Sequence, residues 1–132
     1  MQDSIFTKIL KGEVPGVIVW QDEKAFILMD KFPSVEGQAL VIPKTQIDYM
    51  FSLDEELYLH LWHITNHLAR AMNASFPNTR VCVVVEGFDV PHVHIRVYPV
   101  PHGKPLIAHK GEMADDEVME KLAQTIRSSL TL

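Results

Sequence analysis

The sequence predicts an α+β domain with a five-stranded, mostly antiparallel sheet, one long helix and two shorter ones. Two observations lead to this prediction. Short β-branched or apolar runs recur along the chain between turn residues, and three other segments carry apolar residues at helical spacing. The 132 residues show no repeat, linker or change of composition, so we expect a single domain over residues 1–132.

The first third of the chain is predicted to hold a short helix followed by three strands. Ser4 can cap a helix of about two turns with an apolar stripe, and Gly12 and Pro15 lie beyond its end. The strands and the segments between them are expected in this order: strand 17–21, turn 22–24, strand 25–30, loop 31–38 and strand 39–43.

The rest of the chain is predicted to hold two helices and two strands. A long helix is expected over residues 54–72, because Ser52 and Glu55 have the spacing of a capping box and apolar residues follow at helical intervals. Residues 81–85 form an apolar run, which predicts a buried strand with the lone cysteine, Cys82, in the core. A strand over 92–98 and an amphipathic helix over 115–129 complete the set.

The composition excludes several kinds of partner. Lys and Arg number 12 against 17 for Asp and Glu, and the resulting net charge of −5 argues against a protein that holds nucleic acid or an anionic membrane by bulk electrostatics. No segment approaches the ~20 apolar residues that span a bilayer. The single cysteine forms no intrachain disulfide. We therefore expect a cytoplasmic protein without a nucleic-acid or membrane partner.

The strand over 92–98 carries the most informative group of polar residues. His92, His94 and Arg96 alternate with apolar residues, so they project from one face with roughly 6 to 7 Å between successive Cα atoms. A neutral imidazole can attack phosphorus and leave again, and a neighbouring guanidinium can stabilise the charge on the phosphate oxygens. Three alternatives remain open from spacing alone: an exposed polar face, structural histidines, or a metal pair, for which only Asp89 and His102 lie near as further ligands.

Three motifs in order resemble the histidine-triad (HIT) family of nucleotide hydrolases and transferases, over about residues 3–103. Residues 3–15 resemble the family's opening helix, residues 37–44 (GQALVIPK) resemble its GHxLVIPK strand, and residues 91–99 (PHVHIRVYP) resemble its signature HxHxH strand. The resemblance is Hint-like, with the third signature histidine replaced by Arg96. It implies the HIT-like fold, and no cofactor is expected.

The resemblance implies a role for each member of the row. His94 corresponds to the nucleophile, which attacks the α-phosphate of a nucleotide conjugate to give a nucleotidyl-histidine that water hydrolyses. His92 and Arg96 would hold the phosphate and support this step. Asp30 would accept hydrogen bonds from the ribose hydroxyls, although taken alone it could also start the loop over 31–38.

The resemblance also implies a nucleobase pocket. Ile5, Phe6, Ile9 and Leu28 match positions that enclose the base in the family, whereas the spacing of the helix residues taken alone is more typical of core residues. A second group of histidines, His60, His63 and His67, recurs at helical spacing. We interpret that group as a solvated helix flank in preference to a metal site.

Four departures from the family pattern bear on function. Arg96 is a permanent cation on a longer stem than histidine. Phe88 and Val85 stand where many members carry a glutamine and an asparagine that contact the phosphate, and Gln38 replaces a histidine. Ser4 and Thr7 stand where some members carry a cysteine pair that binds zinc, so we expect no metal.

The resulting hypothesis is a hydrolase of nucleoside phosphoramidates or related nucleotidyl conjugates. Two alternatives are a catalytically impaired purine-nucleotide-binding module and a dinucleoside polyphosphate hydrolase. The resemblance also implies a homodimer that joins two sheets edge to edge, with Trp20, Tyr58 and Trp62 as candidates for its apolar interface.

Overall fold

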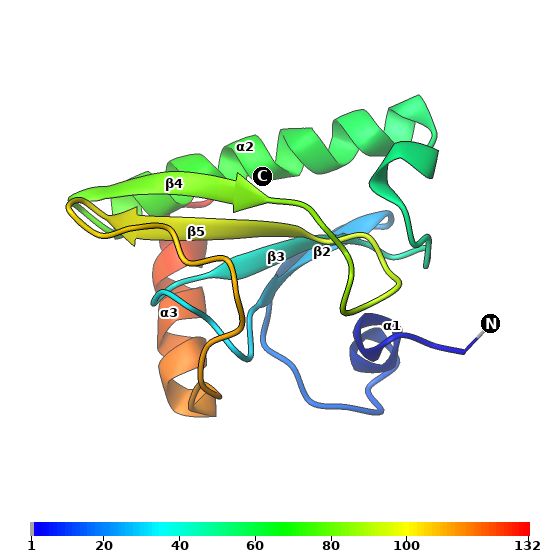
Figure 1. The fold of residues 1–132 in the computed structure, drawn as a ribbon, viewed down its shortest axis with the longest axis horizontal. Helices are drawn as coiled ribbons and strands as arrows, with labels where there is room; N and C mark the ends of the chain where they lie inside the picture. Colours follow the sequence, from blue (N-terminus) through cyan, green and yellow to red (C-terminus); the bar gives the residue numbers. More distant parts are fainter. Residues whose placement is uncertain (1) are drawn as a thin grey trace.

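The computed structural model describes residues 2–132 and confirms the predicted fold class (Figure 1). The strands are β1 (Ile18–Gln21), β2 (Ala25–Met29), β3 (Ala39–Pro43), β4 (Thr79–Val84) and β5 (Ile95–Pro101). They form one sheet in the order β1-β2-β3-β5-β4, and every neighbouring pair is antiparallel. The helices are α1 (Ile5–Leu10), α2 (Glu55–Ser75) and α3 (Asp116–Ser129), with a short 3₁₀ turn η1 (Met50–Ser52) before α2.

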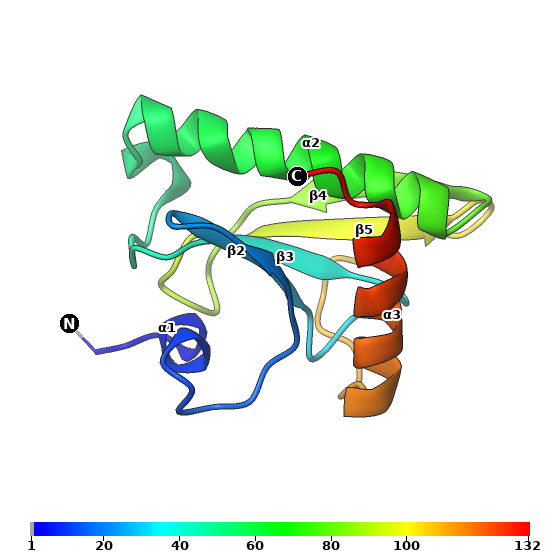
Figure 2. The same ribbon diagram turned by 180° about the vertical axis from the view of Figure 1, so that it is seen from behind.

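The helices cover the two faces of the sheet unequally. Helices α2 and α3 pack on one face, and α1 lies alone against the other (Figures 1 and 2). Side chains alternate across each strand, so Ile27 and Val41 join the core under α2 and α3, while Leu28 and Leu40 join a smaller cluster under α1. Because α1 covers only part of its face, room remains beside it for a ligand.

The predicted helices are found, with one corrected cap. Helix α1 begins at its Ser4 cap as expected, since Ser4 Oγ accepts from the Thr7 amide at 3.2 Å. Helix α2 is capped by Asp54, whose Oδ1 accepts from the Leu57 amide at 2.8 Å. The capping box predicted at Ser52 is therefore wrong, because the chain turns once more in η1 before α2 begins.

Strand β4 differs most from its prediction. It lies at the edge of the sheet, paired only with β5, and its residues are half-buried or exposed. The expectation that residues 81–85 form a buried strand is thus wrong, and Cys82 is half-buried outside the core. An apolar run predicts a strand, but the place of that strand in the sheet order decides whether it is covered.

The signature residues lie partly outside the regular sheet. Strand β5 begins at Ile95 and not at His92 as predicted. The pairing of β5 with β3 starts with Ile95 opposite Val41. Strand β3 ends at Pro43, which has no amide proton to continue the ladder. His92 and His94 therefore precede the strand on a segment held by other contacts.

Within residues 2–132, no helix combines the length and the apolar character that crossing a bilayer requires. The side chains proposed for a dimer interface, Trp20, Tyr58 and Trp62, are partly buried against the core under α2 and α3.

Candidate active site

A cavity of about 960 Å³ opens on the face of the sheet that carries α1. Helix α1 forms one wall, and strands β2, β3 and β5 form the floor through Leu28, Leu40 and Arg96. These three residues are direct register partners across the sheet. A volume of this size is typical of a small-molecule site. The cavity brings together every predicted site residue except His92, whose buried ring contacts Ser4 and Pro43.

The outer wall of the cavity is the segment that connects β5 to α3. Its residues 107–114 are attached to the loop over 31–34: Ser34 Oγ donates to the Ile107 carbonyl at 2.5 Å, and the Gly111 amide donates to the Phe32 carbonyl at 3.0 Å. The two backbones approach so closely that a Cβ on Gly111 would lie 1.8 Å from the Pro33 carbonyl oxygen. Only glycine fits there.

His94 is buried, with 7% of its surface exposed, and lines the cavity. Its Nδ1 lies 2.7 Å from the His92 carbonyl oxygen. A carbonyl can only accept, so Nδ1 carries the proton and Nε2 keeps its lone pair. Among residues 2–132, Nε2 has no hydrogen-bond partner. Burial lowers the pKa of His94, and the Arg96 guanidinium lowers it further, which keeps the imidazole neutral near pH 7.

His92 is fully buried and both of its ring nitrogens are engaged. Nε2 donates to the Pro43 carbonyl at 2.7 Å, so Nδ1 accepts from the Ser4 hydroxyl at 2.6 Å. Burial lowers the pKa of this imidazole as well. The arrangement leaves His92 no free lone pair, so the ring is a neutral structural element behind His94.

Arg96 connects two loops. Its Nη1 donates to the Ala108 carbonyl at 2.6 Å, and its Nη2 forms an ion pair with Glu86 on the loop after β4. Nε is buried without a hydrogen-bond partner in the described residues. The guanidinium thus lies beside His94 with part of its donor capacity unused.

Asp30 and Gln38 form a polar pair at the end of β2 and the start of β3. Gln38 Nε2 donates to Asp30 Oδ2 at 2.6 Å, and the Phe32 amide donates to Asp30 Oδ1 at 2.8 Å. Asp30 therefore both begins the loop and lines the cavity. The two interpretations of this residue are compatible.

The predicted base-enclosing residues of α1 and β2 line the cavity and also contribute to the core. On α1 these are Ile5, Phe6 and Ile9, and on β2 Leu28; Phe6 and Leu28 also belong to the small core cluster. The Phe6 ring packs edgewise on His94, with 5.1 Å between ring centroids. The apolar lining of the cavity therefore reaches the nucleophile candidate, His94, through Phe6.

The burial of the row excludes one of the alternatives left open by its spacing. His92, His94 and Arg96 are 0%, 7% and 9% exposed, so an exposed polar face is wrong. Phe88 is 89% exposed and Val85 36%, and neither lines this cavity. His60, His63 and His67 lie on α2, across the sheet from the cavity, where His60 Nε2 pairs with Asp22 at 2.7 Å.

Sequence reasoning missed Glu86 and the segment 108–110 as parts of the site. A buried arginine requires an anionic or carbonyl partner. That requirement points to the two acidic residues in the short loop before the signature, Glu86 and Asp89, of which Glu86 forms the ion pair. No local pattern identifies the carbonyl of Ala108.

Comparison with known proteins agrees with this architecture of a small-ligand α+β protein. The model of the HIT domain matches residues 11–102. Protein hit of Bacillus subtilis is 29% identical over 103 residues, which cover 74% of this chain and 71% of that protein. Adenosine 5'-monophosphoramidase HNT1 of Saccharomyces cerevisiae is 26% identical over 129 residues, 96% of this chain and 82% of that protein.

A solved structure shows the same fold over almost the whole chain. The Hit-like protein involved in cell-cycle regulation from Bartonella henselae superposes with a TM-score of 0.89 at 26% identity, covering 97% of this chain and 96% of that one. The family model spans most of the chain. The protein therefore belongs to the HIT domain family, a family that includes nucleotide hydrolases.

The place where some family members bind zinc does not suit a metal here. Ser4, Thr7 and Gln46 contribute hydroxyl and amide oxygens that already bond to one another, and both nitrogens of His92 are engaged. Zinc prefers thiolate and imidazole ligands with free lone pairs. In residues 2–132 no three His, Cys, Asp or Glu side chains gather as a metal site.

Proposed function

We propose that this protein hydrolyses nucleoside 5'-phosphoramidates or related nucleotidyl conjugates through a nucleotidyl intermediate on His94. The observation that supports the proposal best is the tautomer of His94: Nδ1–H is bonded to a backbone carbonyl, and Nε2 is left without a partner beside the cavity. A neutral, oriented imidazole at the wall of a cavity is the requirement for nucleophilic attack near pH 7.

The reaction would proceed in two displacements. His94 Nε2 donates its lone pair to the α-phosphorus, the bond to the leaving group breaks, and that group departs with the electron pair and takes up a proton. Water then attacks phosphorus, the bond to Nε2 breaks, and the nucleoside monophosphate is released with the neutral imidazole restored. The carbonyl of His92 stabilises the imidazolium character that Nδ1–H gains during attack.

The remaining residues would bind and orient the substrate. Arg96 lines the cavity beside His94, and the charge of its guanidinium suits the charge that spreads over the phosphate oxygens. Asp30 would accept from the ribose hydroxyls at the cavity edge. Ile5, Phe6, Ile9 and Leu28 would enclose a purine ring without selecting strongly among its edges.

The charge of the cavity favours a phosphoramidate over a dinucleoside polyphosphate. Five acidic residues line it against three lysines or arginines; the acidic ones are Asp30, Glu86, Asp89, Asp116 and Glu120, and the basic ones Lys31, Arg96 and Lys110. Two of the basic groups are already paired, Arg96 with Glu86 and Lys31 with Asp116. Further phosphates in a leaving group would meet this excess of carboxylates, whereas an amine would not.

The test is hydrolysis of adenosine 5'-phosphoramidate by the wild type and by His94→Ala, with calorimetric titration of AMP into both. Turnover by the wild type that is lost in the variant, while AMP still binds, supports the proposal. AMP binding without wild-type turnover would instead favour the impaired binding module. Equal turnover by both proteins would contradict the role of His94.

The homodimer and the cytoplasmic location remain predictions that accompany this function. The exposed edge strand β4 offers unpaired backbone groups to a second copy of the chain. Size-exclusion chromatography with light scattering measures the molar mass of the protein in solution. A mass near the 15.0 kDa of one chain would contradict the dimer.

A further inference from the structure

The nucleophile candidate lies just outside the hydrogen-bond ladder of the sheet. The last pair that joins β3 to β5 is Val41 with Ile95, and the last pair that joins β4 to β5 is Val84 with Arg96. His94 precedes both pairs. The ladder therefore does not by itself fix the His92 carbonyl that orients the His94 ring. The Val93 amide of the same peptide unit donates to the Ile47 carbonyl at 2.7 Å, and the side chain of His92 provides a second anchor.

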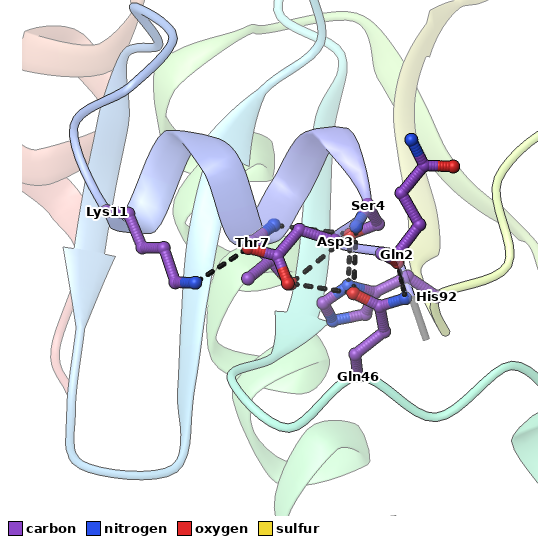
Figure 3. Close-up of polar contacts among 7 residues, drawn as sticks. All are labelled: Gln2, Asp3, Ser4, Thr7, Lys11, Gln46 and His92. Carbon is purple, nitrogen blue, oxygen red and sulfur yellow. Dashed lines mark hydrogen bonds and ion pairs between the residues drawn. The ribbon is translucent and has the colours of Figure 1, made fainter.

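The ring of His92 is anchored at both nitrogens by residues distant in sequence. Pro43 accepts from Nε2 at 2.7 Å, and the Ser4 hydroxyl donates to Nδ1 at 2.6 Å. Figure 3 shows Ser4 at the start of α1 beside the His92 ring, with Gln46 next to both. Ser4 and His92 are 6% and 0% exposed, so water does not replace this contact readily.

The hydrogen bonds around Ser4 favour one direction for its hydroxyl. Ser4 Oγ accepts from the Thr7 amide at 3.2 Å, and its one proton has two acceptors within reach, Thr7 Oγ1 at 3.4 Å and His92 Nδ1 at 2.6 Å, of which the much shorter contact is the one to His92. Gln46 Oε1 accepts from the Ser4 amide at 2.8 Å and from the Thr7 hydroxyl at 3.0 Å (Figure 3). These bonds hold the Ser4 backbone and direct its hydroxyl toward Nδ1, which favours the Nε2–H tautomer of a neutral His92.

We propose that Ser4 is a positioning residue for the nucleophile. Its hydroxyl holds His92 neutral and in one tautomer, and the anchored His92 in turn presents its carbonyl to His94 Nδ1–H. The same residue caps α1, the wall of the cavity, so the ligand-facing helix and the nucleophile share one anchor. The activity readout of this inference rests on the proposed function, but its structural readout does not.

Three variants separate the donor from the helix cap. Ser4→Ala removes both, Ser4→Thr keeps both, and Ser4→Asp keeps the acceptor that caps α1 but replaces the donor to His92 by an acceptor. Thr7→Val is the matched control, because it removes the bond to Gln46 while the Thr7 amide and the contact between Ser4 and His92 stay.

The first measurement is ¹⁵N NMR of the histidine rings in each full-length protein. In the wild type and in Ser4→Thr and Thr7→Val, we expect a neutral His92 with Nε2 protonated and a slowly exchanging His94 Nδ1–H. Ser4→Asp should protonate both nitrogens of His92 at neutral pH. Unchanged His92 signals in Ser4→Asp and Ser4→Ala would overturn the proposal, whether or not the protein is a hydrolase.

The second measurement is the split between kcat and KM. Misplacement of a reacting group lowers kcat, so Ser4→Ala and Ser4→Asp should both lower kcat by about tenfold, with Ser4→Thr restoring kcat. Because Ser4→Asp keeps the cap of α1, its AMP dissociation constant should change by less than about twofold. Thr7→Val should keep kcat within about twofold of the wild type. A loss in Thr7→Val as large as that in Ser4→Ala would instead show a general effect of the α1 cap region and contradict the specific role of Ser4.

Discussion

The molecule carries two groups of regularly spaced histidines that differ in almost every physical respect. His60, His63 and His67 lie along α2, where they are exposed or half-buried, with 4.6 Å between the ring centroids of His63 and His67. Their polar partners are side chains near the surface: Asp22 for His60 and Thr131 for His67. His92 and His94 lie under α1, buried, with ring nitrogens bonded to backbone carbonyls. The two groups are comparable in sequence and opposite in environment.

This difference shows that fixed partners, and not the density of imidazoles, prepare a histidine for chemistry. A ring on an exposed helix flank exchanges tautomers and rotamers in contact with water. A carbonyl that accepts from Nδ1 leaves one ring nitrogen with its lone pair in one direction, as at His94. The comparison can be tested by removing or disturbing each group in turn.

The largest expected effect is on kcat/KM, and it separates His94 from the three histidines of α2. His94→Ala should lower kcat/KM for adenosine 5'-phosphoramidate by about a thousandfold or more, because the nucleophile is lost. The triple variant H60A/H63A/H67A should stay within about twofold of the wild type. Steady-state kinetics on both proteins measures the contrast, and a triple variant as impaired as His94→Ala would remove it.

The next largest effect on activity is expected at Arg96, the cation beside the buried histidines His92 and His94. Arg96→Gln should lower kcat by about a hundredfold, the usual scale for loss of one donor to a transition-state oxyanion. Glu86→Gln is the matched control, since it frees the guanidinium from its ion pair and should tighten AMP binding by several-fold. Calorimetry and kinetics on both variants test this, and weaker AMP binding in Glu86→Gln would contradict it.

A smaller effect is expected at the ribose end of the cavity. Asp30→Asn keeps the shape of the side chain but removes its charge, so the hydrogen bonds to a diol weaken by the ~1.4 kcal/mol that corresponds to a tenfold change in affinity. KM should rise by about tenfold while kcat changes by less than about twofold. An unchanged AMP dissociation constant would show that Asp30 serves only the loop it begins.

The smallest effect is the dependence of stability on pH. Burial lowers the pKa of both His92 and His94 below the ordinary value of 6.5. The unfolded chain therefore binds more protons than the folded chain once the pH falls below 6.5, and the free energy of unfolding decreases until the pH passes the lowered values.

Each unit by which a pKa is lowered corresponds to about 1.4 kcal/mol of this loss. Chemical denaturation at pH 7.5 and 5.5 measures it. His94→Ala should lose less stability between these two pH values than the wild type, because one of the two buried imidazoles is gone. An equal loss of unfolding free energy in the wild type and in His94→Ala would show that other groups cause the pH dependence of stability.

The sequence predicted most of the fold because the fold depends largely on local patterns. The meander of β1 to β3 and the three helices follow from alternation, helical spacing and caps. The burial of β4 and the start of β5 were predicted wrongly. Both depend on which strands become neighbours, and Pro43 interrupts the ladder from a distant part of the chain.

The site was predictable only in part, for the same reason. The row over 92–96 and the cavity-lining positions came from motifs, and the structure places these side chains in or beside one cavity, although their roles stay predictions. The bond between Ser4 and His92 joins residues 88 positions apart. The ion pair of Arg96 with Glu86 also requires the packed loops. Such contacts have no periodicity in sequence.

The segment 107–114, attached to the loop over 31–34, forms the outer wall of the cavity. Strand β5 and helix α3 fix the two ends of this segment, and Gly111 fixes its closest approach. Its contact with the reacting groups is a main-chain one, the Ala108 carbonyl that accepts from Arg96, and a backbone carbonyl is present whatever the side chain. An exchange of the side chains of this wall between relatives, with Gly111 and the backbone at 108 kept, would therefore redesign the substrate range of the protein around an unchanged nucleophile.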